Sequence, residues 1–319
     1  MPDILRDRAG VAAGAGLLVL IAAVLIATGE KESLVIGVIS GAAYGLLALG
    51  LVLIYKSSGV FNFAQGEFGT IAVYVLYLLH FEVPYGLALL GALVAAVVFG
   101  LLLERLVIRP LFESSRVILL VATAGVALLA ISVEIWFGDA QGKTIDRALP
   151  TLDRFSVLGV QISDQRLLLL AVLATLAVVL ALFFNRTNLG LAVIGASQEP
   201  TATELVGISV RKLSTFTWAL AALLGGLAGV IAVPDSNGFT PGILTSAFLI
   251  PAFTAAVLGG MTSLPGAFLG GVIVGVIQAV ATSAPLFDFI PGSAGTFIVF
   301  VVLVGVLAIR PQGLLGKPA

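Results

Sequence analysis

Three polar side chains that could do chemistry lie close together in an otherwise apolar chain. They are Asn62, Gln65 and Glu67, in the stretch "SSGVFNFAQGEF". An amide can donate and accept hydrogen bonds, and a carboxylate accepts them from a cation such as an ammonium group. The three residues could line a path for a polar solute, or they could hydrogen-bond to neighbouring helices and hold the protein together.

Other reactive groups are scarce in this sequence. There is no Cys, and His80 is the single His, which excludes disulfides, thiolate metal sites and paired-His metal motifs. The "GKT" at 142–144 is not a phosphate-binding loop, because Phe137 stands where the first glycine of that motif belongs. No GxSxG motif and no filter-like repeat is present. We therefore predict no catalytic residue and no metal site, and we disfavour an enzyme or an ion channel.

The composition indicates a membrane protein. The chain has 319 residues, of which 60% are hydrophobic and 10% are charged, and its mean hydropathy is +1.17. Soluble domains carry about 25% charged residues. The net charge is −1 with no basic block, which argues against a nucleic-acid partner.

The apolar runs predict the elements that must position the polar residues. A bilayer is crossed by about 20 mostly apolar residues, and about ten such runs can be counted. They lie near 11–29, 34–55, 59–80, 84–104, 117–137, 166–184, 213–233, 244–260, 264–283 and 292–309. The turn formers "GGMTSLPG" at 259–266 leave a broken or re-entrant helix open for the eighth and ninth runs. We predict an all-α, polytopic helical bundle that forms one domain over residues 1–319, with pseudo-symmetric halves of five plus five spans.

Lys and Arg set the predicted orientation, because they favour the cytoplasmic side of a membrane. With both termini inside, the outer segments hold only Lys31, Lys143, Arg147, Arg154 and Arg166. The segment 138–165 is then an outer loop, in which "FSVLGVQIS" predicts a short hairpin, and 185–212 is a cytoplasmic loop. The first run exceeds the about 7 to 15 apolar residues of a signal peptide, so we expect a retained span, with cleavage as the alternative.

A short helix is predicted inside the cytoplasmic loop, in "GASQEPTATELVGISVRK". Pro200 suits the first helical position, and Gly207 can adopt the left-handed conformation that closes a helix. About two turns are marginal in water, so the helix would need a partner, and a solvated loop is the alternative.

Glycines recur at helical spacing in three of the runs. Such small residues let helices approach closely, within one bundle or between two copies, and we expect packing within one bundle. The series are Gly37, Gly41 and Gly45; Gly225 and Gly229; and Gly266, Gly270, Gly271 and Gly275. Glu134, near the outer end of its run, is expected to reach the membrane interface.

Four stretches together carry a resemblance to a known family. They are "GAAYGLLALGLVLIYKSSGVFNFAQGEF", "LGLAVIGASQEPTATELVGISVRKL", "LGGMTSLPGAFLGGVIVG" and "AIRPQGLLG". In this order they resemble the membrane permease subunits of ABC importers for branched-chain amino acids, in particular the high-affinity type that carries an NFA-[HQ]-GE segment. Where that family commonly shows His this chain has Gln65, which argues against a proton-dependent role at that position.

The resemblance implies a transport function and a set of partners. The chain would be one of two related or identical permeases in a bacterial plasma membrane, served by two cytoplasmic ATPases and an extracytoplasmic solute-binding protein. ATP would bind to the ATPases, so no cofactor is expected in this chain. The short helix would couple the bundle to the ATPase through Glu199, Pro200, Thr203, Glu204, Leu205, Val206 and Gly207.

The solute path and the cargo are further implications of the resemblance. For a solute such as Leu, Ile or Val, the residues Asn62, Gln65 and Glu67 are the expected polar contacts. Urea, short amides or other amino acids are alternative cargoes on the same scaffold. A secondary transporter that works without ATP is the alternative from another class, and a scaffold or receptor is disfavoured.

Overall fold

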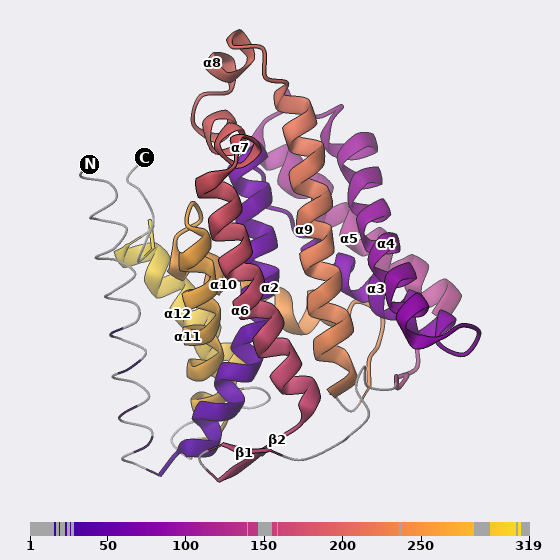
Figure 1. Cartoon of the computed structure of the whole chain (residues 1–319), viewed down its shortest axis with the longest axis vertical. Helices are drawn as coiled ribbons and strands as arrows, with labels where there is room; N and C mark the ends of the chain where they lie inside the picture. The colour runs from indigo at the N-terminus through magenta and orange to yellow at the C-terminus, as the bar shows by residue number, and fades with distance from the viewer. Residues whose placement is uncertain are drawn as a thin grey trace.

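The computed structural model describes residues 16, 19, 23, 26, 29–138, 140–145, 155–157, 159–235, 238–283, 294–310 and 312–313 (Figure 1). Almost all of the predicted first span, 11–29, and much of the predicted outer loop lie outside these residues. The described part is a bundle of helices with one small two-stranded sheet.

The predicted runs and the described helices agree closely. The helices are α2 (Lys31–Ser58), α3 (Gln65–Leu79), α4 (Tyr85–Leu103), α5 (Arg116–Gly138), α6 (Asp164–Arg186), α7 (Asn188–Gln198), α8 (Pro200–Leu205), α9 (Val210–Ala232), α10 (Leu249–Gly259), α11 (Leu264–Ser283) and α12 (Ala294–Ile309). Two π-helical turns, η1 (Glu104–Ile108) and η3 (Leu244–Phe248), extend α4 and precede α10, and the 3-10 turn η2 (Val233–Asp235) follows α9. Among the described residues, six helices are long and apolar enough to cross a membrane.

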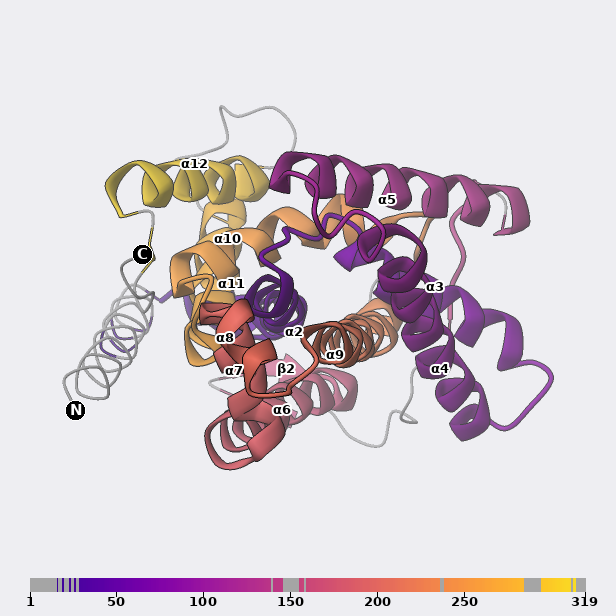
Figure 2. The ribbon, with the colours of Figure 1, turned by 90° about the horizontal axis from the view of Figure 1, so that it is seen from above.

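Helix α2 lies at the centre of the bundle. Every residue from 41 to 54 is buried, as expected for a helix that is apolar on all sides. In the most apolar 18-residue stretch of α2, 83% of the residues are buried. The buried share of the corresponding stretch is 28% in α4 and in α5, and 22% in α6. Seen from above, α2 and α9 stand between α6 and α7 on one side and α10 on the other, while α5 and α12 follow one edge (Figure 2).

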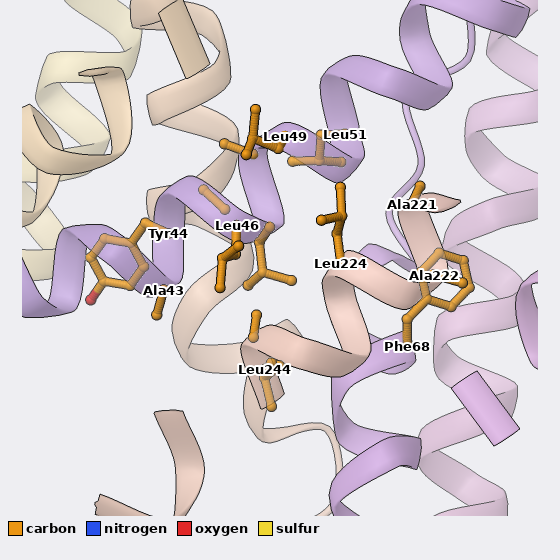
Figure 3. Close-up of a cluster of buried hydrophobic side chains, with 14 of the residues drawn as sticks. Ala43, Tyr44, Leu46, Leu49, Leu51, Phe68, Ala221, Ala222, Leu224 and Leu244 are labelled. Atoms are coloured by element: carbon orange, nitrogen blue, oxygen red, sulfur yellow. The ribbon is translucent and has the colours of Figure 1, made fainter. Parts of the chain in front are cut away.

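Glycines bring α2 and α11 together, because both helices expose backbone where they meet. A methyl group on Gly37 would stand 2.5 Å from the Cα atom of Val276. Gly45 and Gly271 are in similar contact further along the helices. Elsewhere on α2, buried leucines belong to the apolar cluster of the bundle, which includes Leu46, Leu49, Leu51, Leu224 and Leu244 (Figure 3). The expectation that the glycine series pack helices within one bundle is confirmed for these residues.

The third predicted span differs from its expectation, because only its second part is helical. Gly59 ends α2 with a φ of 66°, and its N–H donates to the carbonyl of Tyr55 over 2.8 Å. Residues 59–64 then run without regular structure to the start of α3. The doubtful eighth and ninth runs are two separate helices, α10 and α11, joined by a turn at 260–263.

The hairpin and the short helix are both present. Strand β1 (Phe155–Val157) pairs antiparallel with β2 (Val160–Ile162). The hairpin lies at one end of the bundle and α8 at the other, as the two predicted loops require (Figure 1). The loop 185–212 differs from the prediction of a single short helix, because α7 also lies in it, directly before α8.

Candidate functional site

The irregular stretch before α3 is held by side chains on both sides. Asn62 Oδ1 accepts from the N–H of Ala64 over 3.0 Å, and this bond turns the chain into α3. From α5, Thr123 Oγ1 accepts from the N–H of Phe63 and donates to the carbonyl of Phe61, each over 3.2 Å. Backbone groups in an apolar interior must be paired, so these bonds allow the helix to break there. Thr123 was missed from the sequence because it lies sixty residues away from its partner Phe63.

Asn62 and Gln65 form a buried hydrogen-bonded pair. Asn62 Nδ2 donates to Gln65 Oε1 over 3.4 Å, and Gln65 Nε2 donates to the carbonyl of Ala221 in α9 over 3.0 Å. Asn62 is 1% exposed and Gln65 is fully buried. The two amides therefore tie the start of α3 to the middle of α9.

The hydrogen bonding of Glu67 is different, although Glu67 is only two residues from Gln65 and five from Asn62. It is fully buried, and neither of its carboxyl oxygens has a hydrogen-bond partner among the described residues. The carboxyl group lies beside the Thr245 hydroxyl and the Glu134 carboxyl, but none of these contacts has the geometry of a regular hydrogen bond.

Glu134 lies in the protein interior, which corrects the expectation that it reaches the membrane interface. It is 6% exposed, and its Oε2 accepts from the N–H of Gly242 over 2.8 Å. Thr123, Ala127, Ala130 and Glu134 form one buried face of α5 at helical spacing. This row of small and polar residues along one face of the helix is the signal that could have identified Glu134.

Two glycines of α3 let other segments come close to Glu67. A methyl group on Gly66 would stand 2.5 Å from the backbone nitrogen of Thr245, and one on Gly69 would stand 2.7 Å from the carbonyl oxygen of Gly225. Larger residues at these positions would separate α3 from η3 and α9. The sequence therefore places glycine where Glu67 must meet Thr245.

Helix α8 has well-formed ends. Pro200 is its first residue, and Gly207 has a φ of 84°. Beyond its last turn, the N–H of Gly207 donates to the carbonyl of Glu204 over 2.9 Å, and the N–H of Ile208 to that of Thr203 over 3.2 Å. This pair of bonds is a Schellman motif, which satisfies carbonyls at the end of a helix.

The predicted coupling residues divide into an inner and an outer group. Thr203 is buried, and its hydroxyl donates to the carbonyl of Glu199 over 2.9 Å. Glu199 and Glu204 are exposed, as are Leu205 at 83% and Val206 at 73%. Helix α8 packs on α7 and α9, so these exposed side chains stand on a supported surface.

A partly buried ion pair at the end of α4 is joined to α9 through Thr215 and was not predicted. Arg109 Nη2 lies 3.3 Å from Glu104 Oε2 and donates to Thr215 Oγ1 over 2.7 Å, while Thr215 also donates to Glu104 over 3.2 Å. Glu104 is 1% exposed. Since Thr215 lies in the second turn of α9, just after α8, this cluster connects the short helix to α4.

The described residues hold no cluster of three His, Cys, Asp or Glu side chains that could bind a metal ion.

A recess opens between α2, α6 and α9, and Ile36, Ile39, Leu169 and Ile231 are among its lining residues. None of the predicted solute-path residues lines it.

Comparisons with known proteins identify close relatives. A family model described as "Branched-chain amino acid transport system / permease component" matches residues 33–307. The chain is 32% identical to the high-affinity branched-chain amino acid transport system permease protein BraD of Pseudomonas aeruginosa, over 90% of this chain and 96% of that one. It is 30% identical to LivH of Escherichia coli K12, over 88% and 94%. It is also 30% identical to the probable LivH of Methanocaldococcus jannaschii, over 90% and 93%.

Proposed function

Because the chain belongs to the family of branched-chain amino acid transport permease components, we propose that it moves Leu, Ile or Val into the cell by alternating access. The resemblance seen in the sequence is confirmed, and the chain is a non-catalytic permease subunit of an ABC importer. It is a multi-pass membrane protein, and the bacterial plasma membrane is its proposed location.

The observation that carries the coupling proposal is the exposed surface of α8. Leu205 and Val206 are large apolar side chains at 83% and 73% exposure, at the end of the bundle opposite the hairpin. Apolar surface in water is favourably covered by a partner. We assign that partner to a cytoplasmic ATPase, which would bind ATP, so that this chain needs no cofactor. Movement of the ATPases would reach the bundle through α8 and α9.

The remaining partners follow from the same assembly. An extracytoplasmic binding protein would deliver the solute, and a second permease, related or identical, would complete the path. The outer face of α5 supports a contact with that second permease, since Val121, Gly125 and Leu128 are exposed there and Gly125 has open space beside it. In this proposal the full chain has about ten spans in five plus five halves, with both termini cytoplasmic.

We propose different tasks for the three polar residues of the solute path. Glu67, which lacks a hydrogen-bond partner among the described residues, would meet the solute. Asn62 and Gln65, which bond to each other and to Ala221, would hold the irregular stretch in place beside it. Selectivity would then belong mainly to the binding protein.

Reconstitution tests this function. The chain is assembled with its second permease and two ATPases in proteoliposomes, and uptake of radiolabelled leucine is measured with the loaded binding protein, with ATP and with a non-hydrolysable analogue. We expect uptake that requires hydrolysis and that excess isoleucine or valine suppresses. Uptake by the chain without any ATPase would instead indicate a secondary transporter, and suppression by urea or acetamide alone would indicate the alternative cargo.

A further inference from the structure

Glu67 and Glu134 face each other inside the bundle with most of their acceptor capacity unused. Of their four carboxyl oxygens, Glu134 Oε2 alone is bonded, to the N–H of Gly242 over 2.8 Å. Glu67 Oε1, Glu67 Oε2 and Glu134 Oε1 have no hydrogen-bond partner among the residues that the structure describes. Glu67 comes from α3 and Glu134 from α5, so two helices direct carboxyl groups to one point.

No cationic side chain compensates this pair in the described part of the chain. The ion pair recorded there is between Arg109 and Glu104, in a different cluster. The remaining polar neighbour of Glu67 is Thr245, whose hydroxyl is itself buried without a partner.

Glu104 is a buried carboxylate that holds helices together, and it provides a comparison for the hydrogen bonding of Glu67 and Glu134. It is 1% exposed, and both Arg109 and Thr215 donate hydrogen bonds to it. Burial of a carboxylate is costly unless it is paired in this way, and carboxyls that hold helices together have donors. Glu134 has one such donor, the N–H of Gly242, and Glu67 has none among the described residues, so helix attachment leaves three of the four carboxyl oxygens unexplained.

A primary ammonium group fits the unused acceptors. It carries a positive charge and three N–H donors, and the pair offers three unbonded carboxyl oxygens. When no solute is bound, a proton shared by the two carboxyls can occupy the same place.

We propose that Glu67 and Glu134 together form the subsite that binds the ammonium group of the transported amino acid. This inference rests on the proposed function and adds Glu134, with Thr245 beside it, to the solute path. The subsite also favours an amino acid as the cargo over urea and short amides, because these carry no ammonium group.

The test uses Glu67→Gln and Glu134→Gln in the complete importer. Glutamine keeps the shape of glutamate and can donate an N–H to the remaining carboxyl, so the thermal stability of the complex should be equal to or above that of the unchanged protein. Loss of one charge-assisted bond to the ammonium group should lower leucine uptake about tenfold or more. Uptake by the double variant should be only slightly below that of the more impaired single variant, because the two residues act as one site.

Glu82→Gln is the matched control, since it changes an exposed carboxyl outside the pair. It should leave uptake and thermal stability unchanged. Uptake by both single variants within about twofold of the unchanged protein would overturn the proposed subsite. A loss of stability, with dissociation of the complex, would also overturn it and assign the pair to helix attachment. Failure of the proposed function is distinct, because the unchanged importer would then show no ATP-driven leucine uptake.

Discussion

Gly41 of α2 lies directly against Gly271 of α11, so that a methyl group on Gly41 would stand 2.6 Å from the carbonyl oxygen of Gly271. The contact is between two backbones, which cannot move aside as a flexible side chain would. Close helix packing of this kind replaces the hydrophobic effect as the main source of association within lipid.

Gly41→Val should therefore destabilise the bundle. Inserting extra methyl groups into a tight contact costs about 1 to 3 kcal/mol or more, and here α2 and α11 would have to separate. Thermal unfolding in detergent should show a lower midpoint. Gly305→Val in α12 is the matched control, because nothing lies within 4 Å of a methyl group there. Equal midpoints for the two variants would contradict the packing role.

Asn62→Ala should reduce uptake without dissociating the complex. The substitution removes the oxygen that accepts from the N–H of Ala64 and the donor to Gln65, at a cost of about 1 kcal/mol. The start of α3 would loosen, and Glu67 would be less well positioned. Uptake in proteoliposomes and size-exclusion chromatography measure the two effects separately. Complexes that fall apart during purification would indicate instead that Asn62 mainly holds the helices together.

The exposed end of α8 should be required for association with the ATPase. Glu204→Lys combined with Leu205→Asp changes the charge and removes the apolar side chain that is 83% exposed. Co-purification of the ATPase subunits should fall about tenfold or more, as expected when a central apolar contact of an interface is lost. Glu113→Lys is the matched control, an exposed charge reversal in the segment between η1 and α5. Normal co-purification and ATP-driven uptake in the double variant would refute the coupling role of α8.

Gly207 should tolerate Asn better than Val. Its φ of 84° lies in the left-handed region, which costs a β-branched residue about 1 to 2 kcal/mol and costs Asn less. Gly207→Val should disturb the Schellman motif and weaken ATPase binding, whereas Gly207→Asn should bind nearly normally. Pull-down titrations of the two variants compare them directly. Identical affinities would show that the closing turn of α8 does not matter for docking.

Arg109→Met should destabilise the protein more than Glu104→Gln. The first substitution leaves the buried Glu104 carboxylate without its cation, and breaking such a pair on one side costs about 3 to 5 kcal/mol. Because Arg109 is 33% exposed, solvent screening should bring the effect to the low end of that range. Glutamine at position 104 can still accept from Thr215. Thermal unfolding of the two variants tests this order, and the reverse order would contradict it.

Hydropathy and local signals were enough to predict most of the long helices and the short helix α8 from the sequence. The apolar run predicted for α11 matches residues 264–283, because lipid requires that helices satisfy their own backbone groups. Pro200 and Gly207 predicted the ends of α8, since their effects on backbone conformation act over one or two residues. The predicted start of α3 was wrong because Asn62 and Thr123 stabilise a helix break through side-chain bonds.

The sequence by itself thus determined the class of protein, the positions of most helices and the presence of an unusual polar stretch at 62–67. Only the tertiary structure decided which of those polar residues are bonded and which are not. Gln65 reaches Ala221, and Glu67 meets Glu134, through contacts between segments far apart in the chain. Local periodicity shows which face of a helix is polar or small, but the partner of that face depends on how all the helices pack together.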